Sequence, residues 1–341
     1  MPFNKNKSKI LIILTGGTIC SCEDSNGERS SQADTAQYKI TSIFSESDSP
    51  YNNVEFDYII STDILSENMT VKTWNKMLSD FRALGSAEEF AGIIVLHGTD
   101  TLAYTSSLLS VMLTHLNIPT FLVSAQLPLD NEATNGNANF RAAVELIMNG
   151  IKPNVYAVYK NSDGNMYVHL GAHLKQCANF SDDFFSDDSY MLSDNKNALW
   201  QGVDFENKLN LINEVAELKN GVLLLVPYVG LDYESIDLSK ASVIVHNTYH
   251  TTAVCVERSK KAGEYTSNSI LYFLDKCSEK GVDVLLAPCD AEAFSYESTG
   301  DALQNGAMCV SNKTLELAYT KTLVGHSFGL KGEKLVDFVN N

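Results

Sequence analysis

The sequence has 341 residues, and its 42 acidic and 25 basic side chains give a formal net charge of −17. Hydrophobic residues make up 44% of the chain and charged residues 20%, a composition typical of folded globular proteins that excludes a fibrous or disordered chain. Because binding to phosphate groups requires a surplus of Lys and Arg, the charge also excludes nucleic acid and anionic membranes as expected partners.

The cysteine usage and the N-terminus indicate the cytoplasm. The apolar stretch Ile10 to Leu14 is too short for the hydrophobic region of a signal peptide, and no run approaches the roughly 18 apolar residues of a membrane span. Seven scattered cysteines without a CxxC pair are typical of reduced thiols rather than of a disulfide framework. We therefore expect a cytoplasmic protein that makes no use of a membrane.

Short apolar strands that end in polar turns recur in the N-terminal half. Ile10 to Leu14 stops at the turn Thr15 to Thr18, and Ala91 to Leu96 stops at the turn His97 to Thr101. A third strand, Pro119 to Ser124, precedes a loop and then a helix with an apolar stripe. This alternation predicts a doubly wound, mostly parallel sheet, and ligands of such sheets bind beyond the carboxyl ends of the strands.

A second strand and helix alternation follows in the C-terminal part, after a stretch rich in Asp, Asn and Ser. We predict an α/β protein of two α/β domains, in which the larger N-terminal domain carries the doubly wound sheet and the smaller one is C-terminal. The predicted boundaries are 1–190 for the N-terminal catalytic domain, 191–220 for the linker and 221–341 for the C-terminal domain.

The polar segment from Cys20 to Lys39 shows little apolar periodicity and contains a single tyrosine, Tyr38. Long loops inside compact domains are often lids over active sites, so a lid is one interpretation of this segment. A disordered surface loop is the alternative, and the residues alone favour neither.

The sequence lacks the usual nucleotide-binding motifs, and its matches to hydrolase and metal-binding motifs lack the partner residues that those motifs require. The TGGT turn has no GxGxxG spacing, and GxxxxGK[ST] does not occur. Gly325 to Gly329 fits the GxSxG pattern, but only twelve residues follow it and none is the required His, so we interpret it as the turn between two terminal helices. His246 and His250 lie on an expected strand, and Cys20-x-Cys22 lacks a second pair, so we predict chemistry without metal or cofactor.

A hydroxyl, carboxylate and amine set remains: Thr18 after the first strand, Thr99 and Asp100 after the second, and Lys175 beyond a further segment. A nearby ammonium group lowers the effective pKa of a hydroxyl, and a desolvated amine acts as a base, so these residues are candidates for nucleophilic catalysis. The alternatives stay open at this point: Thr99 and Asp100 are also suited to capping the next helix, and Lys175 to an exposed surface. His97 is expected to be a structural hydrogen-bonding residue.

The two turns also resemble signature motifs of a known family. TGGTI at 15–19 and HGTDT at 97–101, each after a short hydrophobic strand, resemble the signatures of the bacterial-type L-asparaginases, most closely the cytoplasmic type I branch. The resemblance covers nearly the whole chain. Its further supports are SAQLP at 124–128, Asn135-Gly136, Asn139, Lys175 with its aromatic and acidic neighbours, Pro288-Cys289 and Thr299-Gly300.

This resemblance implies hydrolysis of the side-chain amide of L-asparagine to L-aspartate and ammonia through an acyl-enzyme. Thr18 matches the family's nucleophile, Thr99, Asp100 and Lys175 match its supporting set, and Tyr38 is our candidate for its lid tyrosine. Family members form homodimers and homotetramers, so a homo-oligomer is expected.

The resemblance also implies a substrate-binding set. Ser66 and Glu67 match the pair that binds the α-amino and α-carboxylate groups of the substrate, and Asp100 matches the carboxylate that binds its α-ammonium. Ala125 matches the position whose backbone carbonyl meets the amide. These roles are implied by the matching positions and not by spacing.

Three positions depart from the family pattern: Leu65 where Gly or Asp is usual, Asn135 where Asp is usual, and Ala172 where a basic residue is common. They leave open whether L-asparagine, L-glutamine or another amide is preferred. Type I relatives can also carry an asparagine-responsive allosteric site in the C-terminal domain, near a position like Cys289.

Two other functions remain as alternatives. One is the amidase subunit of a tRNA-dependent amidotransferase, which carries an extra region before TGGT, whereas TGGT begins at Thr15 here. The other is a non-catalytic amino-acid sensor, against which the intact set of Thr18, Thr99, Asp100 and Lys175 argues.

Overall fold

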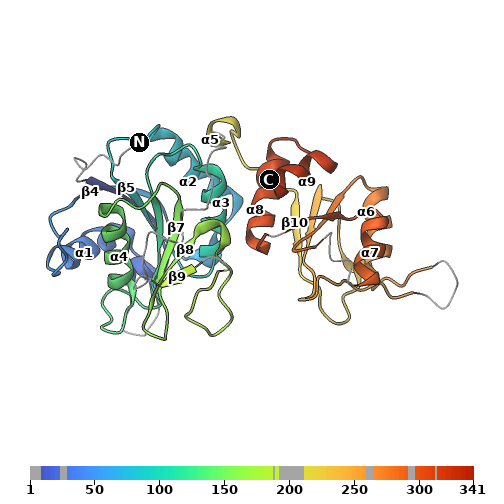
Figure 1. Ribbon diagram of the computed structural model, residues 1–341, viewed down its shortest axis with the longest axis horizontal. Helices are drawn as coiled ribbons and strands as arrows, with labels where there is room; N and C mark the ends of the chain where they lie inside the picture. Colours follow the sequence, from blue (N-terminus) through green and yellow to red (C-terminus); the bar gives the residue numbers. More distant parts are fainter. Residues whose placement is uncertain are drawn as a thin grey trace. The chain divides into compact units, whose positions relative to one another are not determined.

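The computed structural model describes residues 9–23, 29–186, 189–191, 211–258, 264–290, 296–311 and 313–341. Contacts divide the chain into two units, Met1–Ala216 and Glu217–Asn341, and each is an α/β unit built on its own sheet (Figure 1). The expected fold class, with a larger N-terminal and a smaller C-terminal α/β unit, is confirmed.

The sheet of the first unit has seven strands in the order β4-β1-β5-β6-β7-β8-β9. The first five in this order run parallel, and the last two are antiparallel additions. The mostly parallel sheet agrees with the prediction. The strands are β1 (Lys9–Gly16), β4 (Glu55–Ile64), β5 (Gly92–Leu96), β6 (Thr120–Val123), β7 (Val155–Lys160), β8 (Met166–Leu170) and β9 (Ser189–Met191).

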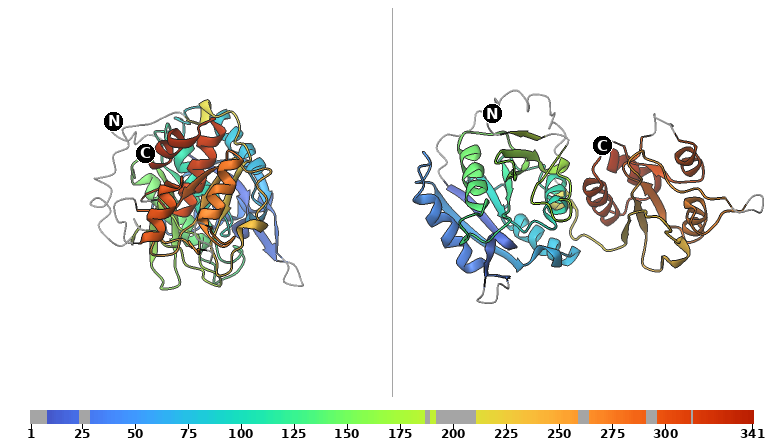
Figure 2. Two further views of the ribbon diagram at one scale, coloured as in Figure 1. Left: turned by 90° about the vertical axis from the view of Figure 1, so that its right-hand side faces the viewer. Right: turned by 90° about the horizontal axis from the view of Figure 1, so that it is seen from below.

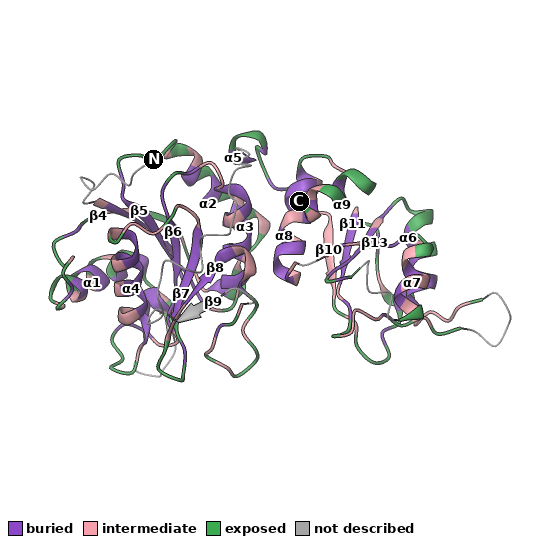
Figure 3. Ribbon diagram, in the orientation of Figure 1, coloured by how far each residue is buried: buried purple, intermediate pink, exposed green. Residues whose placement is uncertain are grey.

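Strand β1 is buried on both faces, because helices cover both sides of the sheet (Figures 1, 2 and 3). Ile10, Ile12 and Leu14 pack into the apolar cluster below two helices, and Leu11 and Ile13 alternate with them toward the opposite face. The two helices of the first face are α1 (Ala33–Ser45) and α4 (Gly136–Met148), and those of the second are α2 (Val71–Ala83) and α3 (Leu102–Met112).

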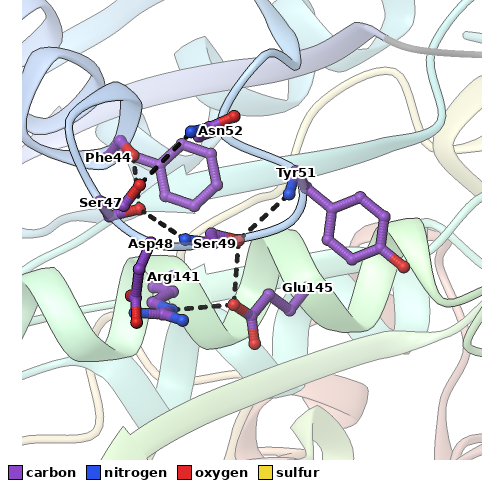
Figure 4. A network of polar contacts seen from close by, with 8 residues as sticks. All are labelled: Phe44, Ser47, Asp48, Ser49, Tyr51, Asn52, Arg141 and Glu145. Carbon is purple, nitrogen blue, oxygen red and sulfur yellow. Dashed lines mark hydrogen bonds and ion pairs between the residues drawn. The ribbon is translucent and has the colours of Figure 1, made fainter.

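A polar network fastens the end of α1 to α4 (Figure 4). Arg141 on α4 binds Asp48 and donates to Glu145 at 2.8 Å, while Ser49 donates to the same Glu145 oxygen at 2.9 Å. The Ser47 hydroxyl donates to the Phe44 carbonyl at 2.6 Å and closes the last turn of α1. These contacts fix how α1 lies on the sheet, and with it the segment that precedes α1.

The segment from Cys20 to Lys39 contains regular secondary structure that neither sequence interpretation predicted. It contains the antiparallel strands β2 (Ser21–Glu23) and β3 (Arg29–Ser31), and α1 begins at Ala33, although residues 24–28 lie outside the described part. The buried stripe of α1 starts with Ala33 and Ala36 and becomes strongly apolar only at Ile40 and Phe44. Two alanines make a weak periodic signal, which is why the helix was missed.

The second unit is a parallel sheet in the order β10-β11-β12-β13, covered on both faces. Ile244 and Leu286 pack with α6, and Val245 and Leu285 pack on the other face with α9. Its elements are β10 (Val222–Leu225), β11 (Val243–His246), β12 (Asp283–Leu286), β13 (Met308–Cys309), α6 (Ile270–Glu279), α7 (Glu297–Gln304), α8 (Leu315–Ser327) and α9 (Gly332–Asn340).

Most of the expected linker, 192–210, lies outside the described residues, and of the rest, 211–216 belongs to the first unit and 217–220 to the second. Arg82 on α2 donates to the carbonyls of Ile212 at 2.7 Å and Val215 at 2.8 Å, which ties the short helix α5 (Leu211–Glu214) to α2. These two charge-assisted bonds explain why the compact unit extends to Ala216.

Ser327 of the GxSxG pattern is the last residue of α8, where its hydroxyl donates to the Leu323 carbonyl at 2.6 Å and accepts from the Lys219 amide at 2.8 Å. The pattern therefore closes a helix and is not a nucleophile elbow. Within the described residues, no helix has the length and apolar character needed to cross a bilayer.

Candidate active site

The first candidate turn follows β1, where two consecutive glycines lead to Thr18. Gly16 and Gly17 have φ values of 103° and 79°, in the region that favours glycine, and Thr18 opens the short 3-10 helix η1 (Thr18–Cys20). A Cβ on Gly17 would lie 2.2 Å from the Cα of Gly98. The backbone after β1 therefore touches the backbone after β5, a contact that only two glycines permit.

Thr15 supports the backbone of the turn. Its buried hydroxyl donates to the Leu96 carbonyl at 2.9 Å, and its own carbonyl accepts from the Thr62 hydroxyl at 3.0 Å. Both interactions hold the ends of neighbouring strands in register. Thr18 is half-buried at the end of the same turn, so the two threonines of TGGT differ in position and in burial.

Ser66 connects the turn after β5 to the end of β4. Its buried hydroxyl accepts from the Asp100 amide at 3.1 Å and lies 3.3 Å from the Asp100 carboxylate, and its carbonyl accepts from the Thr101 hydroxyl at 2.9 Å. Thr101 is the N-cap of α3 and makes no side-chain cap. The structure therefore disagrees with the alternative that Thr99 and Asp100 are helix caps.

The segment that carries Lys175 reaches the same turn through its neighbour. The Gln176 side-chain amide donates to the Asp100 carbonyl, and the Lys175 amide donates to the Phe185 carbonyl at 3.0 Å. The Lys175 side chain is exposed. The structure thus brings the Lys175 segment beside Asp100 by a contact that the sequence did not predict.

A cavity of about 320 Å³ opens between this segment and the second turn. Its walls include Thr99, Asp100 and Asp182, so it is acidic, and Tyr159 contributes its buried floor. Burial raises the pKa of Tyr159 to about 12, and the nearby Asp182 and Cys177 act in the same direction, so this phenol stays protonated. The full set of lining residues is Thr99, Asp100, Tyr159, Gln176, Cys177, Ala178, Asn179, Phe180, Ser181, Asp182 and Phe184.

The chain around Ala125, after β6, is held on both sides. The Asn139 amide donates to the Ser124 carbonyl at 2.9 Å, and the Gln126 amide donates to the Asn135 side-chain oxygen at 3.1 Å. Asn135 also donates its NH₂ to the Lys160 carbonyl at 2.9 Å. An aspartate has no donor for that last bond, which gives a physical reason for Asn at this departure from the family pattern.

His97 lies under the second turn, fully buried, with Nδ1 placed 2.7 Å from the Gly98 carbonyl. Since a carbonyl only accepts, Nδ1 carries the proton and the ring is neutral. Burial lowers the pKa of His97 to about 4. His97 is therefore a structural donor that fixes the backbone beside Thr99, in line with the expectation from the sequence.

Acid is expected to destabilise the protein through this residue. The pKa of His97 is about 4 in the folded protein and about 6.5 in the unfolded chain. The contribution of the buried neutral imidazole to the free energy of unfolding is therefore present above pH 6.5 and is lost as the pH falls through 4. The free energy of unfolding should fall by about 3 kcal/mol from His97 alone, measured by urea unfolding between pH 7 and 4. A His97→Gln variant should show a shallower fall, and an unchanged slope would contradict the assignment.

The structure brings together four of the sequence-predicted residues. Thr18, Thr99, Asp100 and Ser66 meet at the carboxyl ends of β1, β5 and β4 through the Gly17–Gly98 and Ser66–Asp100 contacts. This is the edge where ligands of parallel sheets bind.

The other predicted residues differ in placement. Glu67 is exposed on the 3-10 helix η2 (Ser66–Asn68), next to Ser66, and Ala125 is buried after the neighbouring β6. Tyr38 is not brought to the site. It is exposed on α1 with its ring 6.2 Å from that of Tyr58, which pairs with Ile12 in the middle of β1.

Ile12 lies four residues, or about 13 Å, before the end of β1. Among the described residues, the contacts of Tyr38 therefore do not support a lid role. Gln176 and Tyr159 were not predicted from the sequence. The only signal for Gln176 was its position directly after Lys175.

The cysteines near the first turn do not suit metal binding. Cys20 is buried, and burial raises its thiol pKa to about 12, whereas metal ligation needs the thiolate. Within the described residues, no group of three or more His, Cys, Asp and Glu side chains is arranged to hold a metal ion. The groups gathered at the site are hydroxyls and a carboxylate, which suit acyl transfer.

The chain matches a known family model and curated relatives. Residues 9–197 match the family model described as "Asparaginase, N-terminal". The chain is 29% identical over 281 residues to a subunit of the glutamyl-tRNA(Gln) amidotransferase of Saccharolobus solfataricus, covering 76% of this chain and 60% of that one. It is 31% identical over 152 residues to L-asparaginase of Thermococcus kodakarensis, covering 44% of each chain. The chain thus spans about half the length of these relatives.

Solved structures show the same fold over the whole chain. The thermostable L-asparaginase from Thermococcus kodakarensis has a TM-score of 0.71 at 20% identity and covers 98% of this chain and 97% of its own. L-asparaginase I from Vibrio cholerae has a TM-score of 0.69 at 20% identity, with the same coverage. Since the family model covers more than half of the sequence and the two signature turns meet at one sheet edge, the chain belongs to the asparaginase family.

Proposed function

We propose that the protein hydrolyses the side-chain amide of L-asparagine to L-aspartate and ammonia, with Thr18 as nucleophile. The observation that carries the proposal is the Gly17–Gly98 backbone contact, which sets Thr18 beside Thr99 and Asp100. A hydroxyl at a strand end, next to a second hydroxyl and a carboxylate, is an arrangement for covalent acyl transfer.

In the proposed reaction the Thr18 hydroxyl attacks the amide carbon while its proton passes toward Thr99 and Lys175. The C–N bond then breaks, the leaving amine takes a proton and departs as ammonia, and water cleaves the Thr18 ester. Asp100 is exposed at the second turn and is the proposed partner of the substrate's α-ammonium, with Ser66 and Glu67 beside it.

Two backbone amides of the turns are already engaged in hydrogen bonds, so we do not assign the stabilisation of the tetrahedral oxyanion to them. The Gly17 amide already donates to the Ile64 carbonyl at 2.8 Å, and the Asp100 amide donates to Ser66. We therefore assign the stabilisation of the oxyanion to the backbone amides of Thr18 and Thr99.

A second candidate function is supported by the relatives named as glutamyl-tRNA(Gln) amidotransferase subunits, one of which matches 76% of this chain. In that case the same Thr18 chemistry would release ammonia for a partner protein instead of into solution. The cytoplasmic location and a homodimer or homotetramer remain proposals that accompany either function.

Steady-state ammonia release from L-asparagine and L-glutamine separates these candidates. We expect the purified chain alone to turn over L-asparagine at about 1–10³ s⁻¹, with a higher kcat/KM than for L-glutamine. Release only after addition of an amidotransferase partner would favour the second function. Binding of either amino acid without any release would refute both.

A further inference from the structure

We propose that Asp63 and Ser31 act as a pair that positions Thr18. Their hydrogen bond ties the returning end of the segment that begins at Thr18 to strand β4. The inference rests on the proposed function for its effect on turnover, but its structural part stands independently. Neither residue belongs to the set of site residues predicted from the sequence.

The chain leaves the sheet at Thr18 and returns to nearly the same place. The pairing of Ser21 with Ser31 in the β2–β3 ladder and a bond of 2.8 Å from the Gln32 amide to the Cys20 carbonyl hold the two arms together. Thr18 and Ser31 therefore lie near the two ends of one looped segment, which are held side by side. A contact that holds Ser31 in place also limits the movement of η1.

Asp63, near the end of β4, binds Ser31 and holds it in place. Its carboxylate accepts from the Ser31 hydroxyl, and the same oxygen accepts from the Ala33 amide at 3.3 Å. The N-cap residue of α1, Gln32, makes no side-chain cap of its own. Asp63 thus supplies from another strand both an acceptor for the first turn of α1 and a negative charge at its N-terminus.

The pair also lies against the glycines that precede Thr18. A Cβ on Gly16 would lie 2.8 Å from the Ser31 hydroxyl oxygen and 2.2 Å from the Ile64 carbonyl oxygen. The Gly17 amide donates to that same Ile64 carbonyl. Ser31, Asp63 and Ile64 therefore surround the backbone from which Thr18 projects, and they hold it against β4.

The physical consequence is restricted freedom for the Thr18 hydroxyl. Without the carboxylate, the β2–β3 arm has no side-chain tie to β4 among these contacts, and the hydroxyl explores more orientations than attack requires. This mainly lowers kcat. Substrate binding at Ser66 and Asp100 is left intact, because those residues make their own contacts.

The test compares Asp63→Asn and Ser31→Ala with the matched control Ser30→Ala, a neighbouring exposed hydroxyl on the same strand. We expect kcat for L-asparagine to fall about fivefold or more in the first two variants, with KM within about twofold, and no change in the control. Ser31→Thr, which keeps the hydroxyl, should restore most of kcat.

Amide hydrogen exchange of residues 18–21 gives a readout that needs no activity. Exchange should be faster in Asp63→Asn than in Ser30→Ala at equal global stability. Unchanged exchange, or faster exchange with kcat within twofold of wild type, overturns the pairing proposal. Faster exchange in a chain that hydrolyses no amide would instead refute the proposed function and leave the anchoring role standing.

Discussion

Thr18→Ala is expected to abolish turnover of L-asparagine, with kcat reduced by about 10³-fold or more, because the acyl-enzyme cannot form without the hydroxyl. Substrate binding should persist, since Ser66 and Asp100 are joined by their own hydrogen bonds and do not depend on Thr18. Ammonia release, measured with and without substrate saturation, separates the two effects.

Two companion variants make this result specific. Lys175→Met should lower kcat by about 10²-fold or more, as expected for loss of a group that assists proton transfer. Lys160→Met alters an exposed lysine at the end of β7 and should leave kcat unchanged. Near-wild-type amide hydrolysis in Thr18→Ala or in Lys175→Met would exclude the corresponding residue from the chemistry.

Gly17→Ala is expected to cost about 3 kcal/mol or more of the free energy of unfolding and to remove activity. Its φ of 79° is unfavourable for alanine, by about 1–2 kcal/mol. Its Cβ would also lie 2.2 Å from the Gly98 Cα, so the two turns must separate. Denaturant unfolding and the ammonia assay measure both consequences.

Gly85→Ala is the matched control, because Gly85 has a similar φ of 62° and no atom within 4 Å of an added Cβ. It should cost only the backbone term, about 1–2 kcal/mol, and should keep activity. If Gly17→Ala were no more destabilising than Gly85→Ala, the close approach of the two turns would not be the feature that organises the site.

Part of the fold is readable from local patterns. β1, β5 and β6 are short apolar runs bounded by polar turns, and α2 is preceded by Thr70, whose hydroxyl accepts from the Thr73 amide as an N-cap. Such features depend on neighbours in sequence. Helix α1 was missed because its buried face begins with two alanines, and the burial of Ala33 and Ala36 follows from packing on the sheet.

Some residues of the candidate site could also be found from the sequence, and others could not. Thr18, Thr99 and Asp100 were found because each follows a buried strand within a recognisable turn. Tyr38 was proposed as the family's lid tyrosine through the resemblance, yet it packs near Tyr58, which pairs with Ile12 in the middle of β1. A resemblance of motifs cannot show the direction in which a helical residue points.

The α/β class, the two signature turns and the family that they resemble can be read from the sequence, since these follow from periodicity and from contiguous motifs. Which of these residues meet depends on the tertiary structure. Gly17 and Gly98 are 81 residues apart, and Ser66 and Asp100 are 34 apart, so their contacts arise from parallel strand order and register. The anchoring of the Thr18 segment by Asp63 has the same origin, because a carboxylate on β4 has no local signal that marks it as the partner of Ser31.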